Sequence, residues 1–298
     1  MCLSDVHYIK QFPSDFLHIQ CNGALVRERV QQVYQSSPDQ LESMPQQGKI
    51  LLPLSHLPSG SVPAGMPPHL AMRYEHFVSE LHQGRLLRRW DDVIATHPKH
   101  HLKADGNRST TDAFHFGVWE VTASKPRLTR ETREQSPEAK KAIDELLGYV
   151  QSFIAPNIGT ALEQHAPLHA EAMAKAHSRV RQHLKQDLLL RPMVDMGGSF
   201  FAVAVKEFGS GVVHIDWNDS CALYAYIFAV GDWEGGEFCI PQLGIKIPVR
   251  PGQVLAVLAR VLAHFSAPVT SGRCIVFTCF TDALLFEHSH PDVVVVGH

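Results

Sequence analysis

A series of short apolar runs separated by glycine and proline turns limits the folds open to this chain. The runs cover residues 200–205, 221–230, 254–258 and 274–280. Each is rich in strand-forming residues and too short to span a bilayer. Strands that recur every 8–12 residues or so between such turns are typical of β-sandwiches and barrels. We therefore expect an all-β core in this part of the chain.

His214 and Asp216 stand between two of these runs, and His264 follows fifty residues later. Side chains two apart in an extended strand point to the same face, so His214 and Asp216 can bind one ion together. With His264 they make the set of two histidines and one carboxylate that is typical of non-heme Fe(II) oxygenases. Arg273, at the start of the last strand, would supply a cationic fork for a carboxylate-bearing co-substrate. The pattern predicts an iron- and 2-oxoglutarate-dependent dioxygenase.

Two other pairs of a histidine and an acidic residue have the same spacing, but they are less suitable as metal ligands. His290 and Asp292 repeat the spacing, but only His298 follows them, so no barrel can be built beyond them. His169 and Glu171 fall in an expected helix, where a two-residue spacing separates the side chains by about 200°. His264 could instead be a core histidine, and Arg273 a surface turn residue after Gly272. An arginine that enters an apolar strand needs a buried anion, which favours the co-substrate role.

Residues 200–282 resemble the double-stranded β-helix core of the 2-oxoglutarate oxygenase superfamily. The turns at 232–237 and 250–253 and the closing Cys279 to Asp282 resemble fungal oxygenase-domain proteins related to the TET/JBP group, which as a family oxidises methyl groups on nucleic-acid bases. The resemblance implies Fe(II) on His214, Asp216 and His264, with 2-oxoglutarate and O₂ as co-substrates.

Four further site residues are expected beside the metal ligands and Arg273. Many relatives carry serine where this chain has Ile275, so we expect Tyr224 or Tyr226 to supply a second contact to 2-oxoglutarate. Asn218 and Asp219 match positions that help to hold the substrate base in TET/JBP-like enzymes. The alternative stays open that these two residues only form a turn before the next strand.

The fold class expected is α+β: a double-stranded β-helix, of jelly-roll or cupin-like form, with bracing helices. Residues 1–105 are expected to form an N-terminal helical or irregular accessory lobe, and residues 106–298 the oxygenase core. A short helix is expected after Gly23, and another over residues 69–94. Ser136 and Pro137 mark the start of a third helix, and the fourth spans residues 167–189.

Composition narrows the class of partner. The net charge of −3 argues against a strongly basic, non-specific nucleic-acid binder. Basic residues do gather at Lys125, Arg127, Arg130 and Arg133, which are more typical of a solvated face than of a phosphate track. No membrane segment, signal peptide or obligate protein partner is evident. Six cysteines without a C-x-x-C spacing indicate buried thiols in a reducing compartment, so we expect an intracellular protein, nuclear or cytoplasmic.

Three functions stay open from the sequence. The first is oxidation of a modified nucleobase, most simply a methyl group on DNA or RNA. The second is the same chemistry on a small metabolite or a protein side chain, which the modest charge favours. The third is a metal-binding β-helix module without turnover.

Overall fold

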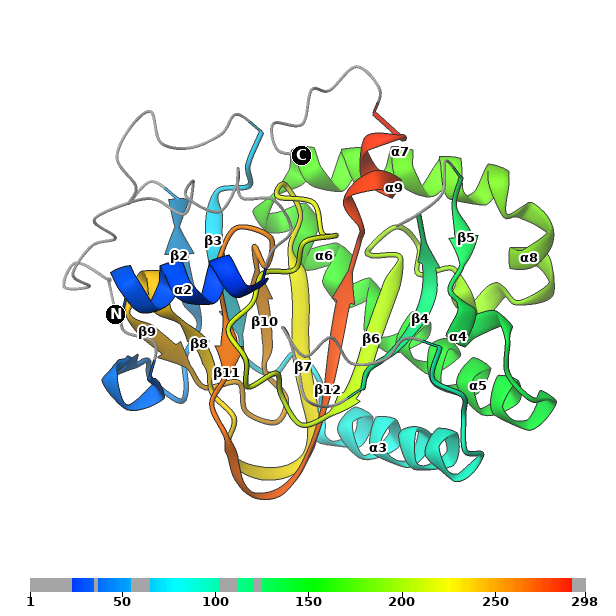
Figure 1. Ribbon diagram of the computed structural model, residues 1–298. Helices are drawn as coiled ribbons and strands as arrows, with labels where there is room; N and C mark the ends of the chain where they lie inside the picture. The colour runs from blue at the N-terminus through cyan, green and yellow to red at the C-terminus, as the bar shows by residue number, and fades with distance from the viewer. Residues whose placement is uncertain (1–22, 35–36, 55–64, 102–111, 121–124, 291–298) are drawn as a thin grey trace.

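The computed structural model describes residues 23–34, 37–54, 65–101, 112–120 and 125–290, which fold around two facing β-sheets (Figure 1). Within this described part, the large sheet has eight strands in the order β2-β3-β10-β7-β12-β6-β4-β5. Their bounds are Ile50–Pro53 for β2, His69–Tyr74 for β3, Val254–Val257 for β10, Ala225–Gly235 for β7, Val269–Phe280 for β12, Ala202–Glu207 for β6, Phe114–Trp119 for β4 and Arg127–Leu128 for β5.

The small sheet has the order β1-β9-β8-β11. Its strands are Glu42–Ser43 for β1, Ile245–Ile247 for β9, Phe238–Ile240 for β8 and Phe265–Ser266 for β11. An antiparallel bridge between His214 and His264 lies directly before β11 and extends this sheet. From residue 202 to 280 the chain therefore alternates between the sheets, with β8 and β9 as the one consecutive pair in the small sheet. This alternation is that of a double-stranded β-helix, so the predicted fold class is confirmed.

Residues before position 106 belong to the same core. Strand β3 pairs with β10, β2 pairs with β3, and β1 pairs with β9. The boundary expected at residue 105 therefore does not separate two bodies of structure, because strands on both sides of it share each sheet. The expectation of a helix over residues 69–94 is corrected in part: 69–74 form β3, and α3 (Glu80–Ala95) begins only after Ser79, whose hydroxyl accepts from the His82 amide.

Helices cover one face of the large sheet. They include α5 (Pro137–Phe153), α6 (Ala155–His165) and α7 (Pro167–His183), followed by α8 (Lys185–Leu190). The expected helix start at Ser136 is confirmed, since its hydroxyl accepts from the Ala139 amide. The long helix expected over 167–189 is instead two helices, α7 and α8, joined at Leu184. Two short helices, α4 (Arg130–Arg133) and α9 (Ala283–Glu287), flank β5 and follow β12.

The alternation of β6 and β12 gives the large sheet two distinct faces. Glu207 lies on the helix-covered face, where its carboxylate accepts from Trp90 of α3. Ala204 and Lys206 point the other way, toward the small sheet, opposite Thr278 and Val276 of β12. We call this side, with Ala229 of β7 opposite Val276, the inner face.

Helix α2 (Gly23–Val33) lies in front of the small sheet (Figure 1). Its Val26 and Val30 are fully buried against Ile215 and Ala263. Ile215 stands between His214 and Asp216, and Ala263 precedes His264. Because side chains alternate along a strand, the three candidate ligands point away from α2, into the space between the sheets.

Candidate metal centre

The structure brings His214, Asp216 and His264 together. One ligating atom from each lies within 4.8 Å of the other two. The backbones of the two histidines form a reciprocal pair, with N···O distances of 3.0 and 2.9 Å, which fixes their side chains next to each other. Each imidazole Nε2 lies 3.8 Å from a carboxylate oxygen of Asp216. Within the described part of the chain, no other group of three or more His, Cys, Asp or Glu side chains is placed to hold a metal.

The second ring nitrogen of each histidine fixes its tautomer. The Nδ1 atom of His214 lies 2.7 Å from the Val212 carbonyl oxygen, and that of His264 lies 2.8 Å from the Leu262 carbonyl oxygen. Since a carbonyl only accepts, Nδ1 carries a proton in both rings, and in the neutral ring the lone pair is then on Nε2. Both Nε2 atoms face Asp216, so the donors are oriented as metal sites require.

The donor set fits Fe(II). Two ligands of one ion lie at most about 4 Å apart, because metal–ligand bonds are near 2 Å. Both carboxylate–imidazole separations of 3.8 Å are inside that limit. Two imidazoles and one carboxylate on one side of an ion leave the remaining positions for small ligands, as in non-heme Fe(II) oxygenases. The ligands are also nearly dry, with His264 only 4% exposed.

Aromatic packing holds His264 in place. Phe238 of β8 stacks on the imidazole, with ring centroids 5.0 Å apart and an interplanar angle of 20°. The two imidazoles of the cluster lie 4.4 Å apart between centroids. Phe238 was not among the sequence candidates, because its contact depends on the pairing of β8 with β11.

The residues after Asp216 form the rim of the cluster. Asn218 is exposed, while Asp219 is buried and its amide donates to the Asp216 carbonyl at 3.0 Å. The backbones of Asp219 and Asp282 form an antiparallel β-bridge at the end of β12. The Ala283 amide also donates to the Asn218 carbonyl. The turn is therefore attached to the strand end beside it. Trp217 packs against the buried group of Val26, Val30, Ile215 and Ala263, and the Arg260 guanidinium carbon lies 4.9 Å from its ring centroid.

Arg273 does not lie beside the cluster, contrary to the expectation. Its guanidinium binds Asp91 of α3 and Glu207 of β6, both at 2.6 Å, on the helix-covered face. These hydrogen bonds raise the pKa of Arg273 above its ordinary value. The physical reason is strand alternation: Cys274, not Arg273, points to the inner face. From Ser271 to Cys279 the pairing with β7 is uninterrupted, so Arg273 shares the helix-covered face with Ile275 and Phe277.

Tyr224 and Tyr226 also lie away from the cluster. Tyr226 is opposite Cys279 and Ala256 on the helix-covered face and is 2% exposed. Tyr224 donates its hydroxyl proton to the His69 carbonyl at 2.9 Å. Burial raises the pKa of both phenols. Neither side chain reaches the inner face, so the expected second contact to 2-oxoglutarate is not at these positions.

Lys206 is an inner-face residue that the sequence analysis overlooked. It follows Ala202 and Ala204 on the same side of β6, and its Nζ lies 3.0 Å from the Ser210 hydroxyl. The sequence signal was a single lysine that ends an apolar run and stands two residues after Ala204, on the same expected strand face. Reading it required knowing which face of β6 meets the small sheet.

In the described part of the chain, the other histidines considered as metal ligands contact backbone carbonyls, and the cysteines are free thiols. His169 contacts the Gly65 carbonyl and His290 the Phe286 carbonyl, while Asp292 lies outside the described residues. The four cysteines of the described part, Cys221, Cys239, Cys274 and Cys279, are free thiols, and burial raises the pKa of Cys274 to about 12. Cys2 and Cys21 lie outside it.

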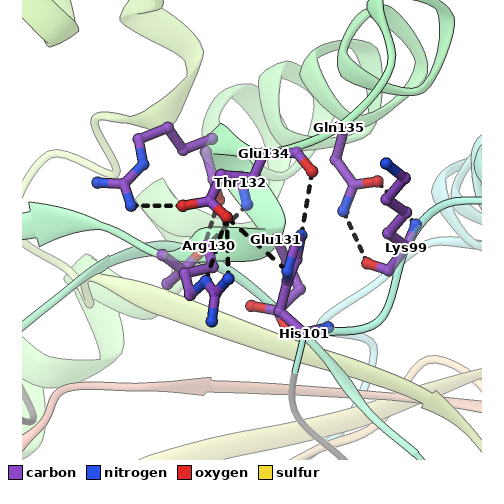
Figure 2. A network of polar contacts seen from close by, with 9 residues as sticks. Lys99, His101, Arg130, Glu131, Thr132, Glu134 and Gln135 are labelled. Atoms are coloured by element: carbon purple, nitrogen blue, oxygen red, sulfur yellow. Dashed lines mark hydrogen bonds and ion pairs between the residues drawn. The ribbon is translucent and has the colours of Figure 1, made fainter.

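The basic stretch at Arg130 and Arg133 is paired with acid. Both guanidinium groups bind Glu134, at 3.2 and 2.6 Å, and these bonds lower the pKa of Glu134. Figure 2 shows Arg130 and Glu134 near Glu131, a buried residue whose carboxylate accepts from the His101 amide at 3.2 Å. The Gln135 amide meanwhile exchanges hydrogen bonds with the Lys99 backbone. The single Glu134 carboxylate therefore holds both guanidinium groups and offsets one of their two positive charges.

Among the described residues, no helix has the length and apolar character needed to cross a membrane.

Comparisons with known proteins find similar folds among solved structures but no match among family models or curated proteins. No family model matches the chain, and no curated protein matches it. The solved structure of NgTET1 in complex with 5mC DNA is similar, at a TM-score of 0.50 and 14% identity, over 72% of this chain and 73% of that one.

Two other solved structures align with lower TM-scores. The viral collagen prolyl hydroxylase from Paramecium Bursaria Chlorella virus-1, in its 2OG complex, aligns at 0.33 and 14% identity over 71% of this chain and 94% of its own. A 2OG-Fe(II) oxygenase family oxidoreductase from Burkholderia pseudomallei aligns at 0.31 and 15% identity, over 88% and 93%. The NgTET1 match sets the conclusion: this chain has the double-stranded β-helix fold that it shares with NgTET1, with the His-Asp-His cluster between its two sheets.

Proposed function

We propose that this protein is an Fe(II)- and 2-oxoglutarate-dependent dioxygenase. The observation that carries the proposal is the buried cluster of His214, Asp216 and His264 between the sheets of a double-stranded β-helix. Fe(II) held there would couple O₂ and 2-oxoglutarate to hydroxylation of a C–H bond, with succinate and CO₂ as co-products.

The chain's own residues prepare the centre in two ways. The Val212 and Leu262 carbonyls accept from Nδ1 of the two imidazoles, which leaves Nε2 of each neutral ring as the atom that would bind the ion. Phe238 and the small sheet keep water from His264, which strengthens the electrostatic interactions of a bound co-substrate.

We further propose a methyl group on a nucleobase as the substrate. The support is the fold match to NgTET1, whose structure contains 5mC DNA, together with the polar pair Asn218 and Asp219 next to the ligands. A carboxylate such as that of Asp219 can accept from the exocyclic amino group of cytosine. A duplex substrate would have to flip the base out of the stack to reach the cluster.

A metabolite or protein side chain is the second candidate substrate. It is favoured by the net charge of −3 and by the contacts of Arg130 and Arg133 with Glu134, an acidic neighbour that competes with a phosphate for them.

The test measures succinate formed from 2-oxoglutarate, and oxidised base by mass spectrometry, with single- and double-stranded oligonucleotides that contain 5-methylcytosine. Asp216→Ala should abolish both products. Asp92→Ala, a matched change at an exposed position on α3, should leave both intact. Succinate without base oxidation on any oligonucleotide would favour the second candidate. Metal binding without succinate under any condition would refute the enzyme and leave a metal-binding module.

A further inference from the structure

We infer that Lys206, in place of Arg273, receives the distal carboxylate of 2-oxoglutarate. This inference rests on the proposed function and names the residue that holds the far end of the co-substrate. It departs from the expectation at Arg273, whose guanidinium binds Asp91 and Glu207 on the opposite side of the large sheet.

The position of Lys206 follows from the pairing of β6 with β12. Lys206 lies opposite Val276, and Ala204 lies opposite Thr278. Both pairs are on the inner face, whereas Glu207, the next residue, contacts Trp90 and Arg273 on the helix-covered face. Lys206 is thus a cation that enters the space between the sheets from the large sheet.

The ammonium group of Lys206 reaches toward the small sheet. Its Nζ lies 3.0 Å from the Ser210 hydroxyl. The Ser210 carbonyl in turn accepts from the Ser266 amide of β11 at 2.7 Å. Ser266 is two residues beyond His264, one same-face step of about 7 Å along the strand. The ammonium is therefore linked through Ser210 to the strand segment that carries His264.

The step of about 7 Å from His264 to Ser266 suits the length of 2-oxoglutarate. Its four carbon–carbon bonds, near 1.5 Å each, span about 5 Å when extended. A molecule whose keto end sits at the cluster would bring its far carboxylate to the level of Ser210 and Ser266.

The surroundings favour a charge-assisted contact at that level. Ala229 and Val276 flank the position with apolar side chains, and Trp233 and Cys274 complete the buried group around them. A lysine ammonium offers three donors on a compact charge, and such a group binds a carboxylate strongly where little water competes.

The experiment is calorimetric titration of 2-oxoglutarate into protein loaded with Mn(II), a metal that binds the same donors without turnover. A second ligand, 2-oxopentanoate, has the same five-carbon chain and keto acid but lacks the distal carboxylate. Lys206→Met should weaken 2-oxoglutarate binding at least about tenfold and leave 2-oxopentanoate binding unchanged. Lys206→Arg, which keeps the charge, should recover part of the affinity. Arg273→Met should change the affinity for 2-oxoglutarate by less than about threefold.

Mn(II) titration of Lys206→Met, with unchanged affinity, checks that the variant is folded around its cluster. Equal binding of 2-oxoglutarate by wild type and Lys206→Met would overturn the inference, as would a larger loss in Arg273→Met than in Lys206→Met. A wild-type protein that binds Mn(II) but neither keto acid would instead overturn the co-substrate in the proposed function, and the inference with it.

Discussion

Asp282 is a buried carboxyl group that joins three segments. It is 2% exposed, and its oxygens accept from the Leu285 amide at 3.0 Å and the Glu120 amide at 2.9 Å. The first bond caps α9, and the second ties the end of β4 to the end of β12. Desolvation outweighs both hydrogen bonds and raises the pKa of Asp282 from 3.8 to about 6.

This shift predicts a pH-dependent stability. Because the folded protein holds the Asp282 proton more tightly than the unfolded chain, the contribution is complete below pH 3.8 and is lost as pH rises through about 6. The slope from one group is at most about 1.4 kcal/mol per pH unit. Asp282→Asn keeps a capping oxygen and does not titrate. Its free energy of unfolding, measured in urea from pH 4 to 7, should rise relative to wild type. Parallel curves for the two proteins would contradict the assignment.

The candidate ligands were predictable from sequence, and the position of Arg273 was not. His214 and Asp216 share a strand face through their spacing of two, and that rule holds locally. Arg273 follows a register shift between Val269 and Ser271, and Gly272 has a φ of +79°. The face of Arg273 depends on its pairing with Asp232, far away in the chain, which sequence spacing alone does not give.

At the scale of elements, α2 is the support of the metal cluster. Val26 and Val30 are fully buried against Ile215 and Ala263, the neighbours of the ligands. Tyr34, just after the helix, packs against the same group. The helix thus fixes the two backbone segments that carry the imidazoles.

We expect Val30→Ala to destabilise the fold and the centre together. Removing two buried methyl groups should cost about 2 kcal/mol of unfolding free energy. The affinity for Mn(II) should fall as well, because the segments that carry the ligands lose their backing. Val33→Ala is the matched control, since Val33 is 39% exposed and its change should cost less than about 0.5 kcal/mol. Equal effects of the two substitutions, measured by urea unfolding and metal titration, would refute the role of α2.

Elements were predicted where local signals are strong. Ser136 before Pro137 marks a helix start that needs no tertiary information. The residues of β3 were expected to be helical because Tyr74 shares a helical spacing with Phe77, Val78 and Leu81. Pairing with both β2 and β10 outweighs that propensity. Which strands share a sheet, and so which residues line its inner face, depends on pairing partners far away in sequence.

At the scale of the whole molecule, one ion would join segments fifty residues apart. His214 and His264 meet only through the bridge that extends the small sheet. A ligand that binds the folded chain but not the unfolded chain raises its stability by mass action.

We therefore expect Mn(II) at a hundred times its dissociation constant to add about 2.7 kcal/mol of stability. For a chain of this size that is a rise of roughly 5–10 °C in Tm. A chelator should reverse the shift. Asp216→Ala should show no rise, and a similar rise in that variant would place the stabilising metal elsewhere. Differential scanning calorimetry makes the measurement.

The alternation of the chain between two sheets has a mechanical consequence. The donors for a metal come from the small sheet, whereas Lys206 extends from the large one. A molecule gripped at one end by each layer would act as a strut and resist sliding of the layers past each other. Amide hydrogen exchange in β6 and β11 should then slow together when both the ion and the keto acid are present, and less with the ion alone.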